Sequence, residues 1–331
     1  MSESQAANWL DPFSGNALPI AQNSEKVIMD FLVENRSFFN VIKEPVEYLL
    51  VSLENTLTGS PPLVVLACAV LIAWQMAGRN QAIVTGVLLA GLGFIGPGMW
   101  EATMTTISVV LCSLFLCLLL GIPLGIWAGL SDRAYAIMRP ILDTMQTIPS
   151  FVYLVPVAIL FGVGNAPGVV VTAVHALPPV IRLTALGLRQ VPEDVIEASA
   201  SFGATPTQVL LKVRLPLSVP SIMVGVNQTL MMCLSMAVVA SMIAVGGLGL
   251  EVLRAIGRLD VGLAIVSGTG IVVLAIILDR ITQGPVELAK KDPHRKWYQH
   301  GPARLVWLLV RGVTGSKAGA PEQSMAADSA S

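Results

Sequence analysis

The residue types and spacing that most strongly indicate a function lie in one short polar segment between two long apolar ones. The segment reads E-A-S, three residues, glycine, nine residues, and then V-R-L-P. Such a segment is either an ordinary helix-turn-helix connection or a compact knob with a partly apolar face, which another protein can bind and move. The residues at the defined positions of the pattern are Glu197, Ala198, Ser199, Gly203, Val213, Leu215 and Pro216.

Local signals predict that this segment begins with a short helix and a tight turn. Pro192 suits the first turn of a helix, and the carboxylates of Glu193, Asp194 and Glu197 favour the positive end of the helix dipole. Gly203 is placed to end the helix in the left-handed conformation, which glycine adopts at little cost.

A second short helix is predicted directly after the turn. Thr205 takes the N-cap position, Pro206 the first helical position and Gln208 the third, which is the arrangement of a capping box. Pro216 is expected to stop this helix before the next apolar segment begins. The unit is therefore predicted to be short and rigid, as a joint that transmits force between subunits must be.

The chain carries none of the residue sets that catalysis would require. It has no G-x4-G-K-[S/T] motif, so it cannot hydrolyse ATP alone. His175 lies in an apolar segment without a carboxylate beside it in sequence, while His294 and His300 lie near the C-terminus, so we expect no catalytic residue, metal site or cofactor. The cysteines form no CxxC and are expected to be buried apolar residues: Cys68, Cys112, Cys117 and Cys233.

Composition indicates a membrane protein. Of the 331 residues, 54% are hydrophobic and 12% charged, with a mean hydropathy of +0.73, whereas soluble domains carry about 25% charged residues. Long uncharged stretches reach the roughly 20 residues that a membrane span needs. We therefore predict an all-α, polytopic membrane helical bundle, with about seven transmembrane helices near residues 62–78, 81–98, 104–130, 144–162, 167–187, 217–244 and 262–279.

The placement of lysine and arginine predicts the orientation of the bundle. The bends after the second and fourth spans carry neither residue, whereas the bends after the first, third and fifth spans and the C-terminal tail carry many. We therefore expect the N-terminus to be periplasmic and the C-terminus cytoplasmic. The docking segment then lies in the cytoplasm. The basic residues of those three bends are Arg79, Arg133, Arg139, Arg189, Lys212 and Arg214.

Four regions are expected along the chain. Residues 1–60 form a periplasmic tail with amphipathic helices, in which Pro45 restarts the helix; this tail lies either on the membrane surface or against the bundle itself. Residues 61–100 supply two accessory spans, and residues 101–280 form the main core with the docking segment at 190–216. Residues 281–331 form a basic, partly disordered cytoplasmic tail.

The docking pattern resembles the EAA loop of ABC-importer permeases, with Ser199 and Val213 as conservative departures from the usual residues. The similarity extends over the core from Ile107 to Asp279 and is greatest to the glycine betaine/proline branch of the type I, binding-protein-dependent family. Further segments that carry the resemblance are residues 142–156, 161–168, 176–182, 225–231, 241–249 and 256–260.

This resemblance implies a subunit that works inside a larger assembly. Two copies of the permease form a homodimer in the bacterial inner membrane, surrounded by lipid. Two cytoplasmic ATPase subunits bind ATP and magnesium and dock on the EAA loops, while a periplasmic binding protein delivers substrate. Glu197 and Gly203 are the expected main coupling positions, and the expected role is osmoprotectant uptake.

The substrate path is weakly marked in the sequence. A quaternary ammonium group is attracted to aromatic faces by about 0.5–2 kcal/mol each, and polar side chains inside spans are further candidates. Each of them also suits ordinary packing or hydrogen bonding between helices. The candidates are Trp127, Gln146, Phe151, Tyr153, His175 and Asn227.

Other functions remain open at this point. Delivery of choline, another quaternary ammonium compound or an amino acid would use the same architecture. A stand-alone channel or secondary transporter would need acidic residues inside its spans, and the spans lack them almost entirely. An intramembrane enzyme would need a paired serine and histidine or two acids. The formal net charge of −1 argues against nucleic acid as a partner.

Overall fold

The computed structural model describes residues 20–291, with side chains over residues 39–285. This range is helical and holds no strand, so the predicted all-α bundle is confirmed. The elements are α2 (Ile20–Gly59), α3 (Pro62–Ala77), α4 (Arg79–Ile95), α5 (Met99–Leu130), α6 (Asp132–Thr147), η1 (Ser150–Tyr153), α7 (Leu154–Phe161), α8 (Asn165–Arg189), α9 (Glu193–Ser201), α10 (Pro206–Val209), η2 (Leu210–Arg214), α11 (Leu215–Val239), η3 (Ala240–Ile243), α12 (Leu248–Arg258) and α13 (Val261–Lys291).

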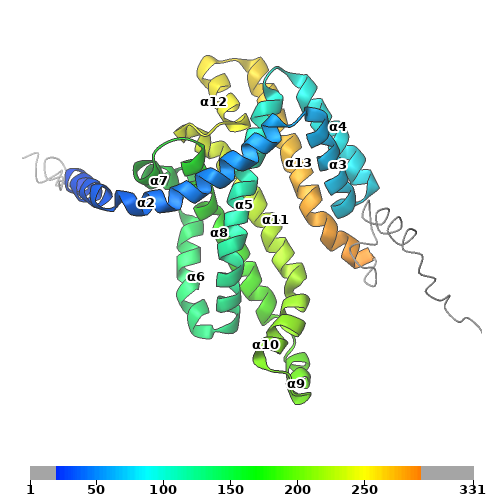
Figure 1. Cartoon of the computed structure of the whole chain (residues 1–331). Helices are drawn as coiled ribbons and strands as arrows, with labels where there is room; N and C mark the ends of the chain where they lie inside the picture. Colours follow the sequence, from blue (N-terminus) through cyan, green and yellow to red (C-terminus); the bar gives the residue numbers. More distant parts are fainter. Residues whose placement is uncertain (1–19, 292–331) are drawn as a thin grey trace, which may run out of the picture.

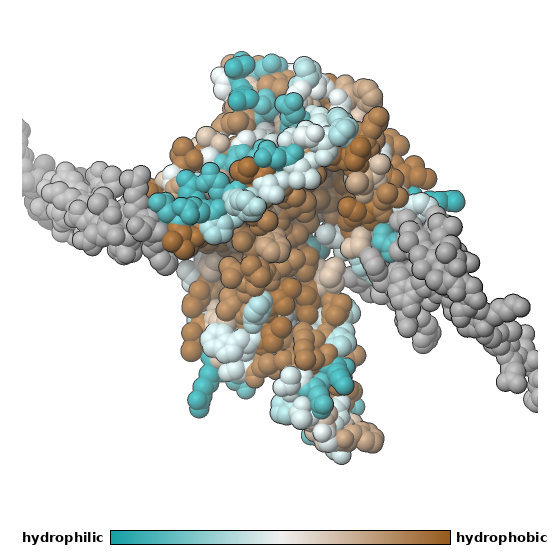
Figure 2. Space-filling model, viewed as in Figure 1, coloured by the Kyte–Doolittle hydropathy of each residue, from teal (hydrophilic) through white to brown (hydrophobic). Residues whose placement is uncertain are grey.

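Helices α5, α8 and α11 form the centre of the molecule, with α6 on one side and α3, α4 and α13 on the other (Figure 1). Helices α9 and α10 project at one end, here called the loop end. Helices α2, α7 and α12 lie at the opposite end, here called the crossing end. Figure 2 shows apolar side chains over the middle of the bundle and polar ones on α2 and at the loop end, as expected for a protein that spans a membrane.

Four described helical segments are long and apolar enough to cross a membrane, and two bent helix pairs raise the number of candidate spans to six. About seven spans were expected. The first two expected spans correspond to α3 and α4, which have 16 and 17 residues and pack together beside α13. The four long segments are Met99–Leu130, Asn165–Arg189, Pro206–Ile243 and Val261–Pro285.

Small residues allow the central helices to approach closely. Gly121, Gly125 and Gly129 recur every fourth residue of α5 and so lie on one face, which packs against α8. A Cβ atom at Gly125 would lie 2.6 Å from the Thr184 Cβ and 2.9 Å from the Ile181 carbonyl oxygen. The spacing is that of small residues at helix interfaces within membranes, where close backbone contact replaces the hydrophobic effect.

A polar cluster joins α11 to α13. The Asn227 side-chain amide donates to the Asp279 carboxylate at 3.2 Å, and Gln283 donates to the same carboxylate. Thr282 donates in turn to the Asn227 amide oxygen at 2.5 Å. Since these groups lie between apolar helices, their mutual hydrogen bonds offset the cost of removing them from water.

The predicted span at residues 144–162 is not one continuous helix in the structure. Helix α6 ends at Thr147, and Ile148 takes an extended conformation (φ −70°, ψ 127°) because the following Pro149 disfavours a helical residue before it. The chain then bends by 105° between α6 and the η1–α7 segment. This break places α7 at the crossing end (Figure 1).

The prediction that Pro45 restarts the N-terminal helix is also wrong, because α2 runs unbroken for 40 residues. Val46 and Leu50, just beyond the proline, are 6% and 1% exposed within the main core. Burying two such side chains contributes roughly 3–6 kcal/mol, enough to offset the ~3 kcal/mol cost of a proline inside a helix. In addition, Thr105 of α5 donates to the Glu54 carboxylate at 2.9 Å. The N-terminal tail was expected either on the membrane surface or against the bundle. The described part of α2 packs against the bundle.

The expected last span at residues 262–279 is longer in the structure, since α13 continues through Pro285 to Lys291. The remainder of the predicted C-terminal tail, residues 292–331, lies outside the described residues, as do residues 1–19 of the predicted N-terminal tail.

Candidate functional site

The docking segment forms the tip of the loop end (Figure 1). Its first helix, α9, begins after Pro192 and carries Glu193 and Asp194 in its first turn, as predicted. Glu197 and Ala198 lie exposed on this helix, and Ser199 is half-buried. The Glu197 side chain is therefore open to solvent and not packed against the rest of the bundle.

The turn after α9 has the predicted conformation. Gly203 has φ +81°, in the left-handed region that side chains disfavour. Its N–H donates to the Ala200 carbonyl at 2.9 Å, and the Ala204 N–H donates to the Ser199 carbonyl at 3.2 Å. These two bonds are those of a Schellman motif, so the backbone of the E-A-S segment and Gly203 form one rigid cap.

Replacing Gly203 by valine is expected to distort this turn. Nothing lies within 4 Å of the position that a Cβ would occupy, so the substitution acts through backbone strain alone. That strain amounts to about 1–3 kcal/mol for a side chain held at positive φ. We expect Gly203→Val to lower the ATP-driven uptake that the EAA-loop resemblance implies roughly tenfold or more, measured in vesicles containing equal amounts of inserted protein.

Gly203→Asn provides the matched control for this prediction. Asparagine tolerates the left-handed conformation far better than a β-branched residue does. We therefore expect the asparagine variant to keep most of the uptake. Equal loss in both variants would show that the position needs the absence of a side chain and not the turn geometry.

The second helix begins as predicted. The Thr205 hydroxyl accepts from the Gln208 N–H at 3.4 Å, and the Gln208 side chain accepts from the Thr205 N–H at 2.9 Å, which completes the capping box. Both helices of the docking segment thus have well-defined ends facing each other across Gly203. The segment can therefore move as one body.

The prediction that Pro216 separates this helix from the next span is wrong. Residues Pro206–Ile243 form one helical segment of 38 residues. Within it, Leu210–Arg214 form a π turn, and the Leu215 N–H donates to the Leu210 carbonyl. Pro216 follows in the first turn of α11, where a missing N–H is tolerated beside the widened turn. Helix α10 is therefore continuous with a helix long enough to cross the membrane.

Two exposed apolar side chains were missed by the sequence analysis. Phe202 is 92% exposed at the tip of the turn, and Leu211 is 58% exposed on the π turn. An aromatic residue immediately before the turn glycine in a polar loop was the available signal. Such a side chain gains most when it is buried in a partner, so Phe202 extends the predicted docking surface.

The structure brings two of the predicted path residues together. The rings of Tyr153 and His175 meet edge to face, with centroids 5.4 Å apart, and the Tyr153 hydroxyl donates to the Met145 carbonyl. Asn227 takes part in the polar cluster with α13 described above.

The other predicted path residues are separated. Gln146 and Phe151 are exposed on opposite sides of the break between α6 and α7, and Trp127 is 55% exposed near the loop end of α5. These side chains do not form one pocket in a single copy of the chain.

Comparison with known proteins identifies the family of the chain. Residues 121–283 match the family described as "Binding-protein-dependent transport system inner membrane component". The glycine betaine/proline betaine transport system permease protein ProW of Escherichia coli (strain K12) is 52% identical over 304 residues, which are 92% of this chain and 84% of that protein. The glycine betaine/carnitine transport permease protein GbuB of Listeria monocytogenes serotype 1/2a (strain 10403S) is 39% identical, covering 83% of this chain and 98% of that protein.

A chain of the MetNI methionine ABC transporter in an inward-facing conformation has the same core fold. It superposes with a TM-score of 0.52 at 24% identity, covering 59% of this chain and 97% of that chain. The predicted resemblance to type I ABC-importer permeases is confirmed by these findings. The chain belongs to the family of inner membrane components of binding-protein-dependent transport systems.

Proposed function

We propose that this chain is the translocation subunit of an ATP-driven importer for glycine betaine and proline betaine. The observation that carries the proposal is the 52% identity, over 92% of the chain, to a glycine betaine/proline betaine permease. Choline is the alternative substrate, but the choline permease OpuBB of Bacillus subtilis is only 28% identical over 56% of this chain. Betaines are therefore the favoured cargo.

The loop end faces the cytoplasm in this proposal and docks on the ATPase subunits. Glu197, Phe202 and Leu211 supply an exposed carboxylate and two exposed apolar groups, a combination suited to a protein partner. ATP and magnesium are bound by that partner. Because α10 continues into α11, closure of the ATPases rotates or shifts a helix that reaches the crossing end.

A second copy of the chain packs on the side formed by α6 in the proposed assembly. Asp143, Thr144, Gln146 and Thr147 are all exposed on this apolar-flanked helix. Polar side chains facing lipid are costly, so this side must border protein or water. The exposed residues of the α3–α4 hairpin are instead mainly apolar, as expected at a lipid surface: Leu63, Val64, Leu71, Ile72, Ile83, Val84, Val87 and Phe94.

The path between two such copies runs along α6 and the break before α7. Gln146 and Phe151 are exposed and border this path. The ring contact between Tyr153 and His175 joins the segment after the break to α8. Trp127 borders the path at its cytoplasmic end. The α3–α4 hairpin is an accessory unit outside this path.

Reconstitution in proteoliposomes tests the proposal. The chain, its ATPase and its periplasmic binding protein are combined, and ATPase activity and substrate accumulation are measured with glycine betaine, choline or proline. We expect ATP-dependent accumulation of glycine betaine, with ATPase activity stimulated by the loaded binding protein. If only choline or proline stimulates the ATPase activity, the proposed substrate is wrong. If no ATPase associates with the chain, the proposed docking role is wrong.

A further inference from the structure

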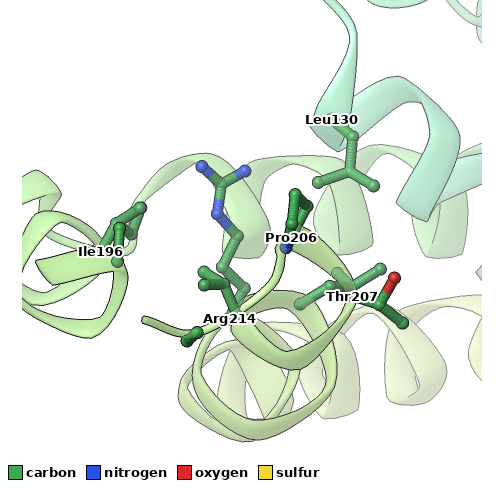
Figure 3. A pocket seen from close by; sticks show the side chains of 9 residues that line it. Leu130, Ile196, Pro206, Thr207 and Arg214 are labelled. Atoms are coloured by element: carbon green, nitrogen blue, oxygen red, sulfur yellow. The ribbon is translucent and has the colours of Figure 1, made fainter. Parts of the chain in front are cut away.

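A cleft of about 540 Å³ lies behind the docking helices, between α9, α10 and the end of α5. Its walls are almost entirely apolar, and one charged side chain, Arg214, enters it. Figure 3 shows the Arg214 guanidinium extending into the space between Ile196 on one side and Leu130 and Pro206 on the other. The remaining lining residues are Ala200, Ala204, Thr207, Val209 and Leu210.

Arg214 differs from the other arginines whose side chains the structure describes. Arg182 pairs with Asp143, Arg189 with Asp132 at 2.9 Å, and Arg254 with Glu251 at 2.6 Å. The described arginines without an ion pair are exposed, except Arg214, which is half-buried. Its Nε is buried and has no acceptor among the described residues.

A half-buried arginine whose Nε has no acceptor leaves part of its hydrogen-bonding capacity unused. Its planar fork of N–H donors matches a carboxylate, and apolar walls strengthen such a pair by excluding water. The carboxylates of α9 do not complete it, because Glu193, Asp194 and Glu197 are exposed and line no part of the cleft. The missing group must therefore come from outside the described chain.

We propose that this cleft receives an acidic side chain of the ATPase subunit, which pairs with Arg214. The inference rests on the proposed function, and it adds a specific second contact behind the docking helices. The cleft is continuous with the proposed docking surface, since α9 and α10 form both. The complementary element is a carboxylate flanked by apolar residues, so the ATPase grips the docking segment from both sides.

Affinity measurements on the full permease in lipid nanodiscs test this pairing. Arg214→Gln is expected to weaken binding of the ATPase about 30-fold or more, because it leaves the partner carboxylate unpaired. Arg214→Lys should recover only part of the affinity, since an ammonium cannot offer the planar fork. Arg133→Gln is the matched control, because Arg133 is exposed on α6, lies outside the docking segment and does not line the cleft. We expect it to change the affinity less than about threefold.

Chemical labelling of the wild-type chain keeps the test independent of whether the variants fold. Phenylglyoxal modifies accessible arginines, and mass spectrometry follows the Arg214 peptide. We expect labelling of Arg214 in the permease alone and strong protection when the ATPase is saturating.

Three outcomes separate the possible failures. Equal affinity of wild type and Arg214→Gln, or labelling unchanged by the ATPase, would overturn the inference while leaving the docking role intact. Protection of Arg214 without ATPase would assign the carboxylate to a second copy of the chain or to its own tail, which also overturns it. Absence of any ATPase binding by the wild type would instead overturn the proposed function.

Discussion

Replacing Gly125 by leucine is expected to prevent the bundle from assembling. The first atom of any side chain at this position would lie 2.6 Å from the Thr184 Cβ and 2.9 Å from the Ile181 carbonyl oxygen of α8. The carbonyl belongs to the backbone of a central helix and cannot move aside alone. Overpacking by a single methylene already costs about 1–3 kcal/mol, so a leucine must separate α5 from α8.

The measurement is the amount of monodisperse protein after detergent extraction, followed by its thermal unfolding midpoint. We expect Gly125→Leu to yield no monodisperse protein, and Gly125→Ala to lower the midpoint. Gly91→Ala is the matched control, because Gly91 lies in α4 with no atom within 4 Å of the Cβ position. Alanine there should be neutral or slightly stabilising, since it favours the helix by about 0.8–1 kcal/mol over glycine. A stable Gly125→Leu protein would show that α5 and α8 can separate without loss of the fold.

Local signals predicted the docking segment well because its ends are determined by neighbouring residues. The left-handed turn at Gly203 and the capping box from Thr205 to Gln208 both occur as expected. Each depends on hydrogen bonds within a few residues, and the residue types that form them are specific. Such features are readable without knowledge of the tertiary fold.

Prolines were interpreted less successfully, because their effect depends on packing elsewhere. Pro45 and Pro216 were both expected to interrupt a helix, yet α2 continues through the first and the π turn accommodates the second. Pro149 does end a helix, although the residues around it looked like a continuous span. Whether a proline breaks a helix depends on the tertiary contacts that hold both sides, and hydropathy carries no information about those contacts.

Two residues of the candidate site required the structure. The sequence places Arg214 within the docking motif, but only the fold shows that it lies half-buried beside apolar walls, with no acceptor for its Nε among the described residues. Phe202 precedes the turn glycine in a polar loop, but only the structure shows that its side chain is 92% exposed. The exposure of an apolar side chain and the lack of a partner for a charged one both depend on the tertiary fold of the chain.

Reversing the charge at Glu197 is expected to abolish ATP-driven uptake while the protein remains inserted. Glu197 is exposed on α9, and its carboxylate makes none of the ion pairs in the described part of the chain. Arginine is a good helix former, so α9 itself should persist. An exposed carboxylate at a docking surface suits a basic group of the ATPase. An arginine placed opposite that group makes a like-charge contact that costs several kcal/mol, which corresponds to a loss of ATPase affinity of roughly 100-fold or more.

The affinity for the ATPase and the rate of uptake are measured together for Glu197→Arg, Glu197→Gln and Glu251→Arg. Glu251 lies on α12 at the crossing end and pairs with Arg254, so its reversal applies the same change in charge far from the docking segment. We expect Glu251→Arg to bind the ATPase normally and Glu197→Gln to show an intermediate loss. If Glu197→Arg binds and transports as the wild type does, Glu197 has no part in docking. Loss of ATPase binding in Glu251→Arg as well would instead attribute the effect to net charge, because the two positions share no partner.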